Sequence, residues 1–330
     1  MQYRTLRNTK ISASAVALGT WAIGGGTWWG PSDDQDSIKA IQAAVAEGIT
    51  LIDTAPAYGW GHSEEIVGRA LKGRRDKVTL STKCGLWWKD ERGSSFFELE
   101  GKHVRRCLLP ETIREELEDS LRRLKTDYID LYHTHWQSLE PEKYPLEDAM
   151  GCLMQLKQEG KIRAIGASNV NLEEIKAYQS AGTLDAIQPK YSMLDREIEK
   201  QILPYCHDQY ISTLAYSPLE QGLLTGKIGM DRTFPEGSFR NNIPWFLPVN
   251  RKKVLNMLEG WSDLTKKYKC SLSQMVIAWT IAQEGITFVL CGARKEQHVR
   301  ENVGAGDLVV DAADLKRMRK DVEALGAPQS

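Results

Sequence analysis

Short apolar stretches rich in β-branched residues alternate along the chain with longer stretches whose apolar residues recur at helical spacing. Eight short stretches predict strands: Ala15–Trp21, Thr50–Ala55, Val78–Lys83, Tyr128–His135, Ile162–Asn169, Ala186–Ser192, Ile211–Ser217 and Thr287–Ala293. A predicted helix lies between each pair. Eight strand–helix units in 330 residues predict an α/β fold, a (β/α)8 TIM barrel that forms a single domain over residues 1–330.

The helix that begins at Pro110 shows the helical pattern most clearly. In PETIREELEDSLRRLK a proline opens the helix, acids come early and bases come late, as helix termini prefer. Its apolar face is formed by Ile113, Leu117, Leu121 and Leu124. Outside the repeat, YRTLRNTKISA predicts an N-terminal hairpin and DAADLKRMRKDVEAL predicts an extra C-terminal helix.

Two long segments interrupt the alternation. One runs from Gly85 to about Leu109 after the third predicted strand, and the other from Pro218 to about Val249 after the seventh. Structureless stretches of this length in a compact domain are usually functional loops, or else signs that an element has been misassigned. Both follow strand ends at which a barrel builds its active site, so we expect two functional loops without regular structure.

Composition and charge exclude several classes of partner. Hydrophobic residues make up 42% and charged residues 26% of the chain, and the net charge is -1, so nucleic acid is not expected as a partner. The polar start MQYRTLRNTK does not resemble a signal peptide, and apolar runs such as MVIAW are too short to cross a bilayer. Six scattered cysteines without a C-x-x-C motif predict reduced thiols in a cytoplasmic protein.

Three motifs resemble functional sites without meeting their requirements. GGGTWWG is not a dinucleotide fingerprint, because Trp29 occupies the sixth position, and QGLLTGK lacks the first glycine of a phosphate loop. His133 and His135 share a strand face, but no third ligand stands at an informative spacing, so no metal is expected. We interpret His133 as a hydrogen-bonded core histidine.

Polar side chains recur where the predicted strands end. They are Asp53, Lys83, His135, Ser168, Asn169, Gln188, Tyr216, Arg294 and Lys295. In a barrel these ends converge on one mouth, although the residues lie far apart in the sequence.

Together with their neighbours, these residues resemble the aldo-keto reductase family from about Leu18 to Asn302. The family's first signature is matched by Asp53-Thr54-Ala55, Tyr58, Ser63-Glu64 and Val67-Gly68. Further matches are LSTKCG, DLYHTHW, KIRAIGASN, QPKYSML and AYSPLEQGLLTGK. The segment CGARKEQHVRENV resembles a bacterial branch of the family that carries GAR or GAK at this point.

The resemblance implies reversible reduction of aldehydes or ketones to alcohols, with hydride from a nicotinamide cofactor. Tyr58 would donate the proton. A free tyrosine has a pKa of about 10, and we expect Lys83 to lower the pKa of Tyr58. Asp53 would anchor Lys83, and His135 would orient the substrate carbonyl. Glycines beside Trp60 are expected to bend the backbone so that Tyr58 faces the mouth.

The resemblance also implies a cofactor site. Ser168, Asn169 and Gln188 would hold the nicotinamide amide, and Tyr216 would stack on its ring. The remaining predicted cofactor residues are Gly19, Thr20, Trp21, Asp53, Ser217, Pro218, Leu219, Gln221, Gly222, Lys227, Gly292, Arg294, His298, Glu301 and Asn302.

The expected cofactor is NADP(H), with NAD(H) possible. Gly292-Ala293 replaces a Lys-Ser pair found in many members of the family, and His298 replaces an arginine. Arg294, Lys295 and His298 could still grip a 2′-phosphate.

Tryptophans cluster after the first four predicted strands, at positions 28, 29, 60, 87, 88 and 136. Indole faces suit the C–H faces of a sugar or a polyol. We therefore predict an aromatic wall for sugar-like or polyol-type substrates, with Trp29, Trp60 and Trp136 as its main members. The oligomeric state is not predicted.

A second function remains open. Some relatives bind NADPH as regulatory subunits of potassium channels and turn over little, and those subunits also keep the four predicted catalytic residues. Oxidation of NADPH by a carbonyl substrate at a metabolic rate would separate an enzyme from such a subunit.

Overall fold

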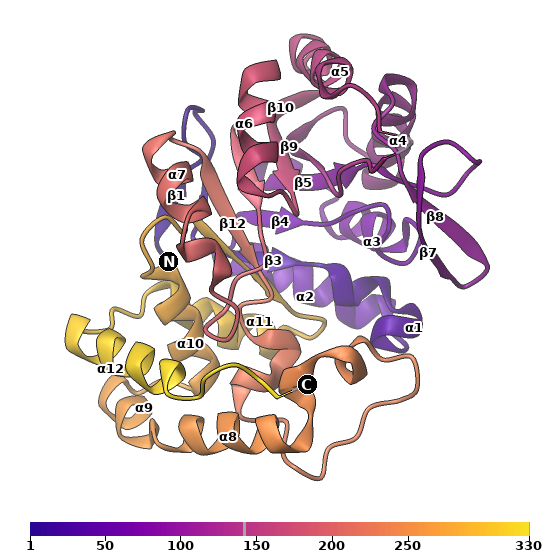
Figure 1. Ribbon diagram of the computed structural model, residues 1–330. Coiled ribbons are helices and arrows are strands. Elements are labelled where there is room, and N and C mark those ends of the chain that lie inside the picture. The colour runs from indigo at the N-terminus through magenta and orange to yellow at the C-terminus, as the bar shows by residue number, and fades with distance from the viewer. Residues whose placement is uncertain (141–142, 330) are drawn as a thin grey trace.

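The computed structural model describes residues 1–140 and 143–329. Parallel strands close into a barrel in the order β10-β11-β12-β13-β3-β4-β5-β9, with helices around it (Figure 1). The barrel strands are β3 (Val16–Gly19), β4 (Leu51–Asp53), β5 (Thr79–Cys84), β9 (Ile129–Thr134), β10 (Ile162–Ser168), β11 (Ala186–Gln188), β12 (Ser212–Tyr216) and β13 (Phe288–Gly292). Each predicted strand is present and shorter than expected at one end or both, and the predicted (β/α)8 barrel is confirmed.

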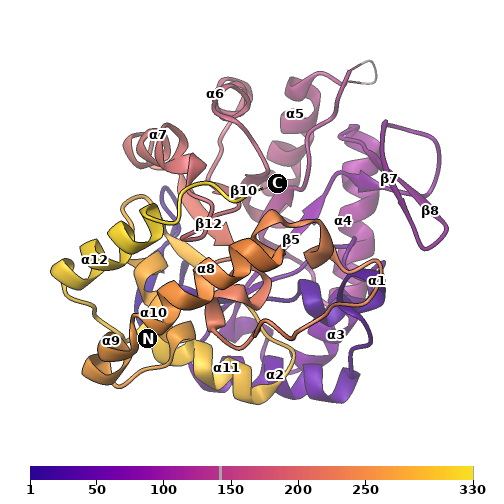
Figure 2. The same ribbon diagram turned by 60° about the horizontal axis from the view of Figure 1, so that its bottom comes forward.

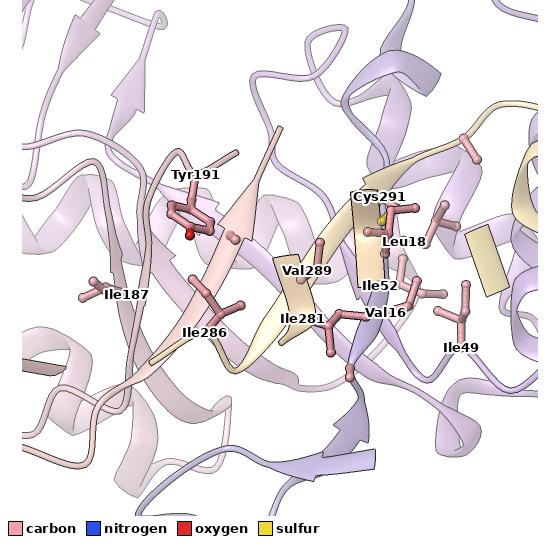
Figure 3. Close-up of a cluster of buried hydrophobic side chains, with 14 of the residues drawn as sticks. Val16, Leu18, Ile49, Ile52, Ile187, Tyr191, Ile281, Ile286, Val289 and Cys291 are labelled. Atoms are coloured by element: carbon pink, nitrogen blue, oxygen red, sulfur yellow. The ribbon is translucent and has the colours of Figure 1, made fainter. Parts of the chain in front are cut away.

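Side chains on the two faces of the strands form separate clusters, as alternation along a strand requires. Inside the barrel, several alanines and leucines such as Leu131 and Leu214 pack with Phe288. On the outer face, Figure 3 shows Val16 and Leu18 of β3 beside Ile52 and Cys291. The outer cluster is the larger one, and it anchors the surrounding helices.

The predicted N-terminal hairpin consists of β1 (Tyr3–Thr5) and β2 (Ser12–Ser14). Leu6, between these strands, is buried in the inner cluster of the barrel, so the hairpin closes the end at which the strands begin. A polar hollow of about 580 Å³ lies beside it, lined by residues such as Lys77 and Tyr128. This hollow is at the opposite end from the predicted site and contains none of its residues.

Helices cover the outside of the barrel. They are α2 (Asp34–Ala46), α3 (His62–Ala70), α4 (Pro110–Leu124), α5 (Leu146–Gln158), α6 (Leu172–Ala181), α7 (Ile202–Asp208), α8 (Pro248–Glu259), α9 (Ser262–Tyr268), α10 (Leu272–Ile281), α11 (Glu296–Val303) and α12 (Ala312–Glu323). The predicted apolar face of α4 is buried. None of the helices within residues 1–140 and 143–329 is both long and apolar enough to cross a membrane.

The expected C-terminal helix is α12, which lies outside the barrel beside α9 and α10 (Figures 1 and 2). Two indoles attach it: Trp261 Nε1 donates to Asp321 Oδ2 at 2.9 Å, and Trp279 Nε1 donates to the Leu315 carbonyl at 3.3 Å. Burial of these two tryptophans under α12 explains why the end of the chain is ordered against the barrel.

The expectation of an irregular loop after β5 was wrong. The segment folds into a three-stranded antiparallel sheet of β6 (Leu86–Trp87), β8 (Lys102–Arg106) and β7 (Ser94–Leu99). Glu100 and Gly101, with φ of 53° and 74°, form the two-residue turn between β7 and β8. This hairpin extends beyond α4 at the side of the barrel (Figures 1 and 2).

The second long segment, after β12, contains three short 3-10 helices: η4 (Glu220–Thr225), η5 (Phe239–Asn242) and η6 (Pro244–Phe246). Part of it runs beside the short helix α1 (Gly26–Trp29) in both views (Figures 1 and 2). The rings of Phe239 and Trp21 lie 5.6 Å apart, and the Arg240 guanidinium lies 4.9 Å from the centre of the Trp29 ring. Two segments far apart in sequence therefore meet across the barrel mouth.

Candidate active site

A buried ammonium occupies the centre of the predicted site. Lys83 Nζ donates to Asp53 Oδ2 at 2.7 Å, to the Thr54 carbonyl at 2.8 Å and to Tyr58 Oη at 3.2 Å. The side chains of Lys83 and Asp53 are 1% and 3% exposed. Because an ammonium has three N–H donors, each of them is used, and its orientation is fixed.

Asp53, the last residue of β4, is held from its other side. Its Oδ1 accepts from Ser81 Oγ and from Gln188 Nε2, each at 2.8 Å. Ser81 was not among the predicted site residues, although it lies two residues before Lys83 and therefore on the same face of β5. Asp53 thus joins β5 and β11 through one carboxylate.

The loop that carries Tyr58 bends sharply, as expected. Gly59, Trp60 and Gly61 have φ of 64°, 57° and 98°. A Cβ on Gly59 would lie 2.3 Å from the carbonyl oxygen of Gly24, so only glycine fits there. This close approach places the chain that leads to α1 directly against the Tyr58 loop.

His135 follows β9 at the same end of the barrel. Its backbone N–H donates to the Cys84 carbonyl at 2.7 Å, and Asn169 Nδ2 donates to its carbonyl at 2.9 Å. Its ring lies edge-on to the Tyr58 ring at 5.9 Å between centres. Burial, together with the positive charge of Lys83, holds the pKa of His135 well below its usual value. A neutral imidazole, with one donor and one acceptor, therefore faces Tyr58.

Lys83 acts to lower the pKa of Tyr58, as expected, but a larger opposing effect leaves that pKa above its usual value. Burial raises the pKa of Tyr58, and Lys83 only partly opposes that rise. Burial lowers the pKa of Lys83, but the attraction of Asp53 and Tyr58 outweighs it, so that the pKa of Lys83 is raised. At neutral pH the tyrosine keeps its proton and the lysine keeps its charge.

The interpretation of His133 as a hydrogen-bonded histidine was wrong. The side chain is fully buried, but neither ring nitrogen has a hydrogen-bond partner among the described residues. A Cβ on Gly166 would lie 2.1 Å from Nδ1 of His133, so the glycine makes room for the ring. Burial lowers the pKa of His133 to about 3, which keeps the imidazole neutral.

Four predicted nicotinamide residues form one cluster at the ends of neighbouring strands. Ser168 Oγ donates to the Gln188 carbonyl at 2.8 Å. Asn169 Nδ2 donates to Ser168 Oγ at 3.2 Å, while its Oδ1 accepts from Tyr216 Oη at 2.8 Å. Since Gln188 also bonds Asp53, this cluster is directly connected to the buried ion pair.

The turn after β12 is strained. Ser217, Glu220 and Gln221 have φ of 59°, 42° and 48°, a region that such residues rarely adopt. Gln221 Nε2 donates to Ser217 Oγ at 2.9 Å, while the buried Oε1 of Gln221 has no partner in the described part of the chain. Strain and an unpaired buried acceptor are typical of a turn built around a ligand, so the predicted cofactor residues of this turn fit such a role.

Further predicted cofactor residues lie at the end of β13, in α11 and in the short segments just before α11 and after η4. Gly292 pairs with Gly19, which ends β3 beside Thr20 and Trp21. Arg294 donates to the carbonyls of Trp29 and Pro31 at 3.3 and 3.1 Å, so its guanidinium holds the segment after α1.

A basic group surrounds His298. Burial lowers the pKa of His298, and the charges of Lys227, Lys295 and Arg294 add to the effect. Lys227 is paired with Glu301 at 2.7 Å, and Asn302 is buried on the same helix. The cluster could receive an anion, although Glu301 already neutralises one of its charges.

The predicted aromatic wall is only partly assembled at the mouth. Trp29 lies edge-on to Trp21 at 5.1 Å, and Trp60 lies edge-on to Trp88 at 5.3 Å. Trp136 packs on Phe96 of the β7–β8 hairpin at 5.2 Å. Another tryptophan of the predicted cluster, Trp87, is 1% exposed and donates to Asp90, so it belongs to the base of the hairpin.

The described residues contain no group of three His, Cys, Asp or Glu side chains arranged to hold a metal ion. The site is instead built from one ion pair, a tyrosine, a neutral histidine and amide side chains.

Residues 15–323 match the model of the Aldo/keto reductase family. The chain belongs to this family. It is 47% identical over 322 residues to the NADH-specific methylglyoxal reductase of Escherichia coli, covering 97% of this chain and 98% of the relative. It is 44% identical over 298 residues to aldo-keto reductase YhdN of Bacillus subtilis, covering 89% of this chain and 86% of the relative.

Solved structures of other aldo/keto reductases superpose on nearly the whole chain. The glycerol dehydrogenase of Gluconobacter oxydans has a TM-score of 0.87 and 39% identity, covering 99% of this chain and 97% of its own. An aldo/keto reductase of Klebsiella pneumoniae in complex with NADP and acetate has a TM-score of 0.69 and 26% identity, covering 97% and 94%.

The geometry gives a physical reason for one part of the family signature in this aldo/keto reductase. Glu64 is fully buried, accepts from Thr82 Oγ1 at 2.6 Å and pairs with Arg123 Nε at 2.7 Å. This residue therefore ties α3 to β5 and α4, and so supports the loop of Tyr58 from behind.

Proposed function

We propose that this aldo/keto reductase uses NAD(P)H to reduce small aldehydes or ketones to alcohols, reversibly, with Tyr58 as proton donor. The observation that carries the proposal is the hydrogen-bonded chain from Asp53 through Lys83 to Tyr58. It ends on a phenol that faces the neutral ring of His135.

Tyr58, Lys83 and His135 each have a separate role in the proposed proton transfer. The nicotinamide cofactor supplies the hydride to the carbonyl carbon when it is bound. Tyr58 gives its proton to the carbonyl oxygen, and the fixed charge of Lys83 stabilises the phenolate that remains. His135, as a neutral donor, orients that oxygen. A proton from solvent then restores the phenol.

The proposed cofactor is NADP(H), with NAD(H) as the alternative. Arg294 and Lys295 offer positive charge for a 2′-phosphate, and His298, neutral because its pKa is lowered, offers a ring N–H. The pairing of Lys227 with Glu301 and the name of the NADH-specific relative support the alternative. The residues at the nicotinamide end do not discriminate between the two cofactors, because the 2′-phosphate that distinguishes NADP(H) from NAD(H) lies at the other end of the cofactor.

Small, oxygen-rich carbonyl compounds are the proposed substrates. The names of two relatives, a methylglyoxal reductase and a glycerol dehydrogenase, refer to oxygen-rich three-carbon molecules, the first a carbonyl compound and the second a polyol. The indoles of Trp29, Trp60 and Trp136 offer apolar faces with single donors, which suit sugar-like and polyol-type molecules. We also propose that the chain acts as a single domain in the cytoplasm, where its free cysteines would stay reduced.

An activity screen tests the function. The purified protein is assayed with a panel of aldehydes, ketones and polyols, each with NADPH or NADH in one direction and the oxidised forms in the other. We expect turnover at about 1 s⁻¹ or faster on at least one small carbonyl, within the usual range of enzymes. Cofactor binding without turnover on any panel member would favour the regulatory-subunit hypothesis instead.

Cofactor choice should depend on Arg294. A guanidinium binds a phosphate through paired charged hydrogen bonds. We therefore expect Arg294→Ala to weaken the binding of NADPH by about tenfold and the binding of NADH by less than about twofold. Titration of cofactor fluorescence measures both dissociation constants. Equal weakening of the two cofactors would mean that Arg294 acts only through the Trp29 and Pro31 carbonyls that it holds.

A further inference from the structure

The tip of the β7–β8 hairpin is tied to both loops that border Tyr58. Glu100 Oε1 accepts from the backbone N–H and the hydroxyl of Thr27, at 2.7 and 2.8 Å. Its Oε2 accepts from Trp60 Nε1 at 2.7 Å. One carboxylate therefore joins α1 and the Tyr58 loop to a hairpin that leaves the barrel after β5.

Glutamate is an unfavourable residue for the backbone conformation at position 100. A two-residue turn with positive φ at both positions favours Asn, Asp or Gly at the first of them, yet Glu100 has φ of 53°. Strain of this kind persists where another interaction compensates for it. The three hydrogen bonds to Thr27 and Trp60 supply that interaction, and they hold the pKa of Glu100 below its usual value.

These contacts connect the hairpin, α1 and the Tyr58 loop to one another. Gly24 and Gly59 bring the two bordering loops together on one side, and Glu100 joins them to the hairpin on the other. Phe97 of the hairpin packs on Trp28 at 5.6 Å, and the Lys102 ammonium lies 5.6 Å from the centre of the Trp60 ring. The position of the Trp60 indole, two residues after Tyr58, is thus fixed from outside its own loop.

We propose that Glu100 is a specificity-determining positioning residue, which holds Trp60 and α1 closed over Tyr58 and so restricts the enzyme to small carbonyl substrates. The proposal rests on the proposed reductase function. A bulky or aromatic aldehyde would have to displace Trp60 or α1, and therefore break charged hydrogen bonds. A three-carbon aldehyde would not.

The test uses Glu100→Asn, because asparagine suits the turn but is too short to reach Thr27 and Trp60 together. Glu98→Asn, at an exposed position of β7 two residues before Glu100, is the matched control. The kcat/KM values for glyceraldehyde and for benzaldehyde are measured with the cofactor that binds more tightly. We expect the preference for glyceraldehyde to fall by about tenfold in Glu100→Asn, as for one lost charged hydrogen bond, and to stay unchanged in the control.

Two further measurements separate positioning from a general structural role. The Tm of Glu100→Asn should equal or exceed that of the unchanged enzyme, because the turn is relaxed. Quenching of tryptophan fluorescence by acrylamide should increase, because the Trp60 indole is released. In a double-mutant cycle, Trp60→Phe should reduce the effect of Glu100→Asn on the substrate preference.

The outcomes distinguish this proposal from the one on which it rests. An active Glu100→Asn enzyme with an unchanged glyceraldehyde-to-benzaldehyde ratio, or with equal losses on both aldehydes, overturns the role of Glu100 alone. Failure of the unchanged enzyme to reduce either aldehyde, or any carbonyl of the activity screen, with both cofactors overturns the reductase function as well.

Discussion

Replacement of Tyr58 by phenylalanine is expected to lower kcat for carbonyl reduction by about a thousandfold, the range of a lost general acid. The phenyl ring keeps the edge contact with His135 and the packing against Trp21, whose ring lies 6.2 Å away. Only the hydroxyl is lost, and with it the proton that the carbonyl oxygen must receive. Steady-state kinetics on the best substrate of the screen measures the effect.

Cofactor binding provides the control for this variant. None of the predicted cofactor residues is changed, so the dissociation constants of NADPH and NADH should stay within about twofold, well below the effect of one hydrogen bond. Retention of more than a few per cent of the original kcat would show that another group delivers the proton. His135 would then be the first candidate.

Hydrophobic patterning was sufficient for the barrel because each strand is buried on both faces. The pattern does not predict where a strand ends, because backbone hydrogen bonding determines that position. The sequence pattern predicted a strand over Ala186–Ser192, but β11 ends at Gln188. Pro189 follows, and because it has no N–H it interrupts the ladder, which resumes only as a single bridge between Lys190 and Tyr216.

The β7–β8 hairpin was missed because its signals are weak. The turn carries Glu100-Gly101 rather than Asn-Gly or Asp-Gly, the pairs that mark a two-residue hairpin. The glutamate is explained only by Thr27 and Trp60, which lie 73 and 40 residues away along the chain. No local pattern contains that information.

That Asp53, Lys83 and His135 lie close together could be predicted from their positions at strand ends, but the electrostatics of this cluster could not. Proximity of Lys83 to Tyr58 was foreseen, whereas the sign of the change in the pKa of Tyr58 depends on how completely the fold excludes water. Ser81 could have been found, since it shares a face of β5 with Lys83 and bonds the same carboxylate. Side chains alternate between the two faces of a strand whether they are apolar or polar, and this rule applied to β5 would have predicted Ser81.

Replacement of Lys83 by methionine is expected to reduce both activity and stability. Without the ammonium, proton transfer from Tyr58 leaves an unstabilised phenolate, so kcat should fall by about a hundredfold or more. Asp53, 3% exposed, would keep its bonds from Ser81 and Gln188 but lose its counter-ion. Removal of one partner from a buried ion pair costs about 3–5 kcal/mol of unfolding free energy. Denaturant unfolding measures that loss.

The double variant Lys83→Met with Asp53→Asn separates the two effects. A neutral amide at position 53 removes the uncompensated buried charge, so we expect most of the lost stability to return, by about 2 kcal/mol or more. Activity should stay as low as in Lys83→Met, because the positive charge next to Tyr58 is still absent. If kcat recovered together with stability, Lys83 would act by holding the fold of the site, and the electrostatic role assigned to its ammonium would be wrong.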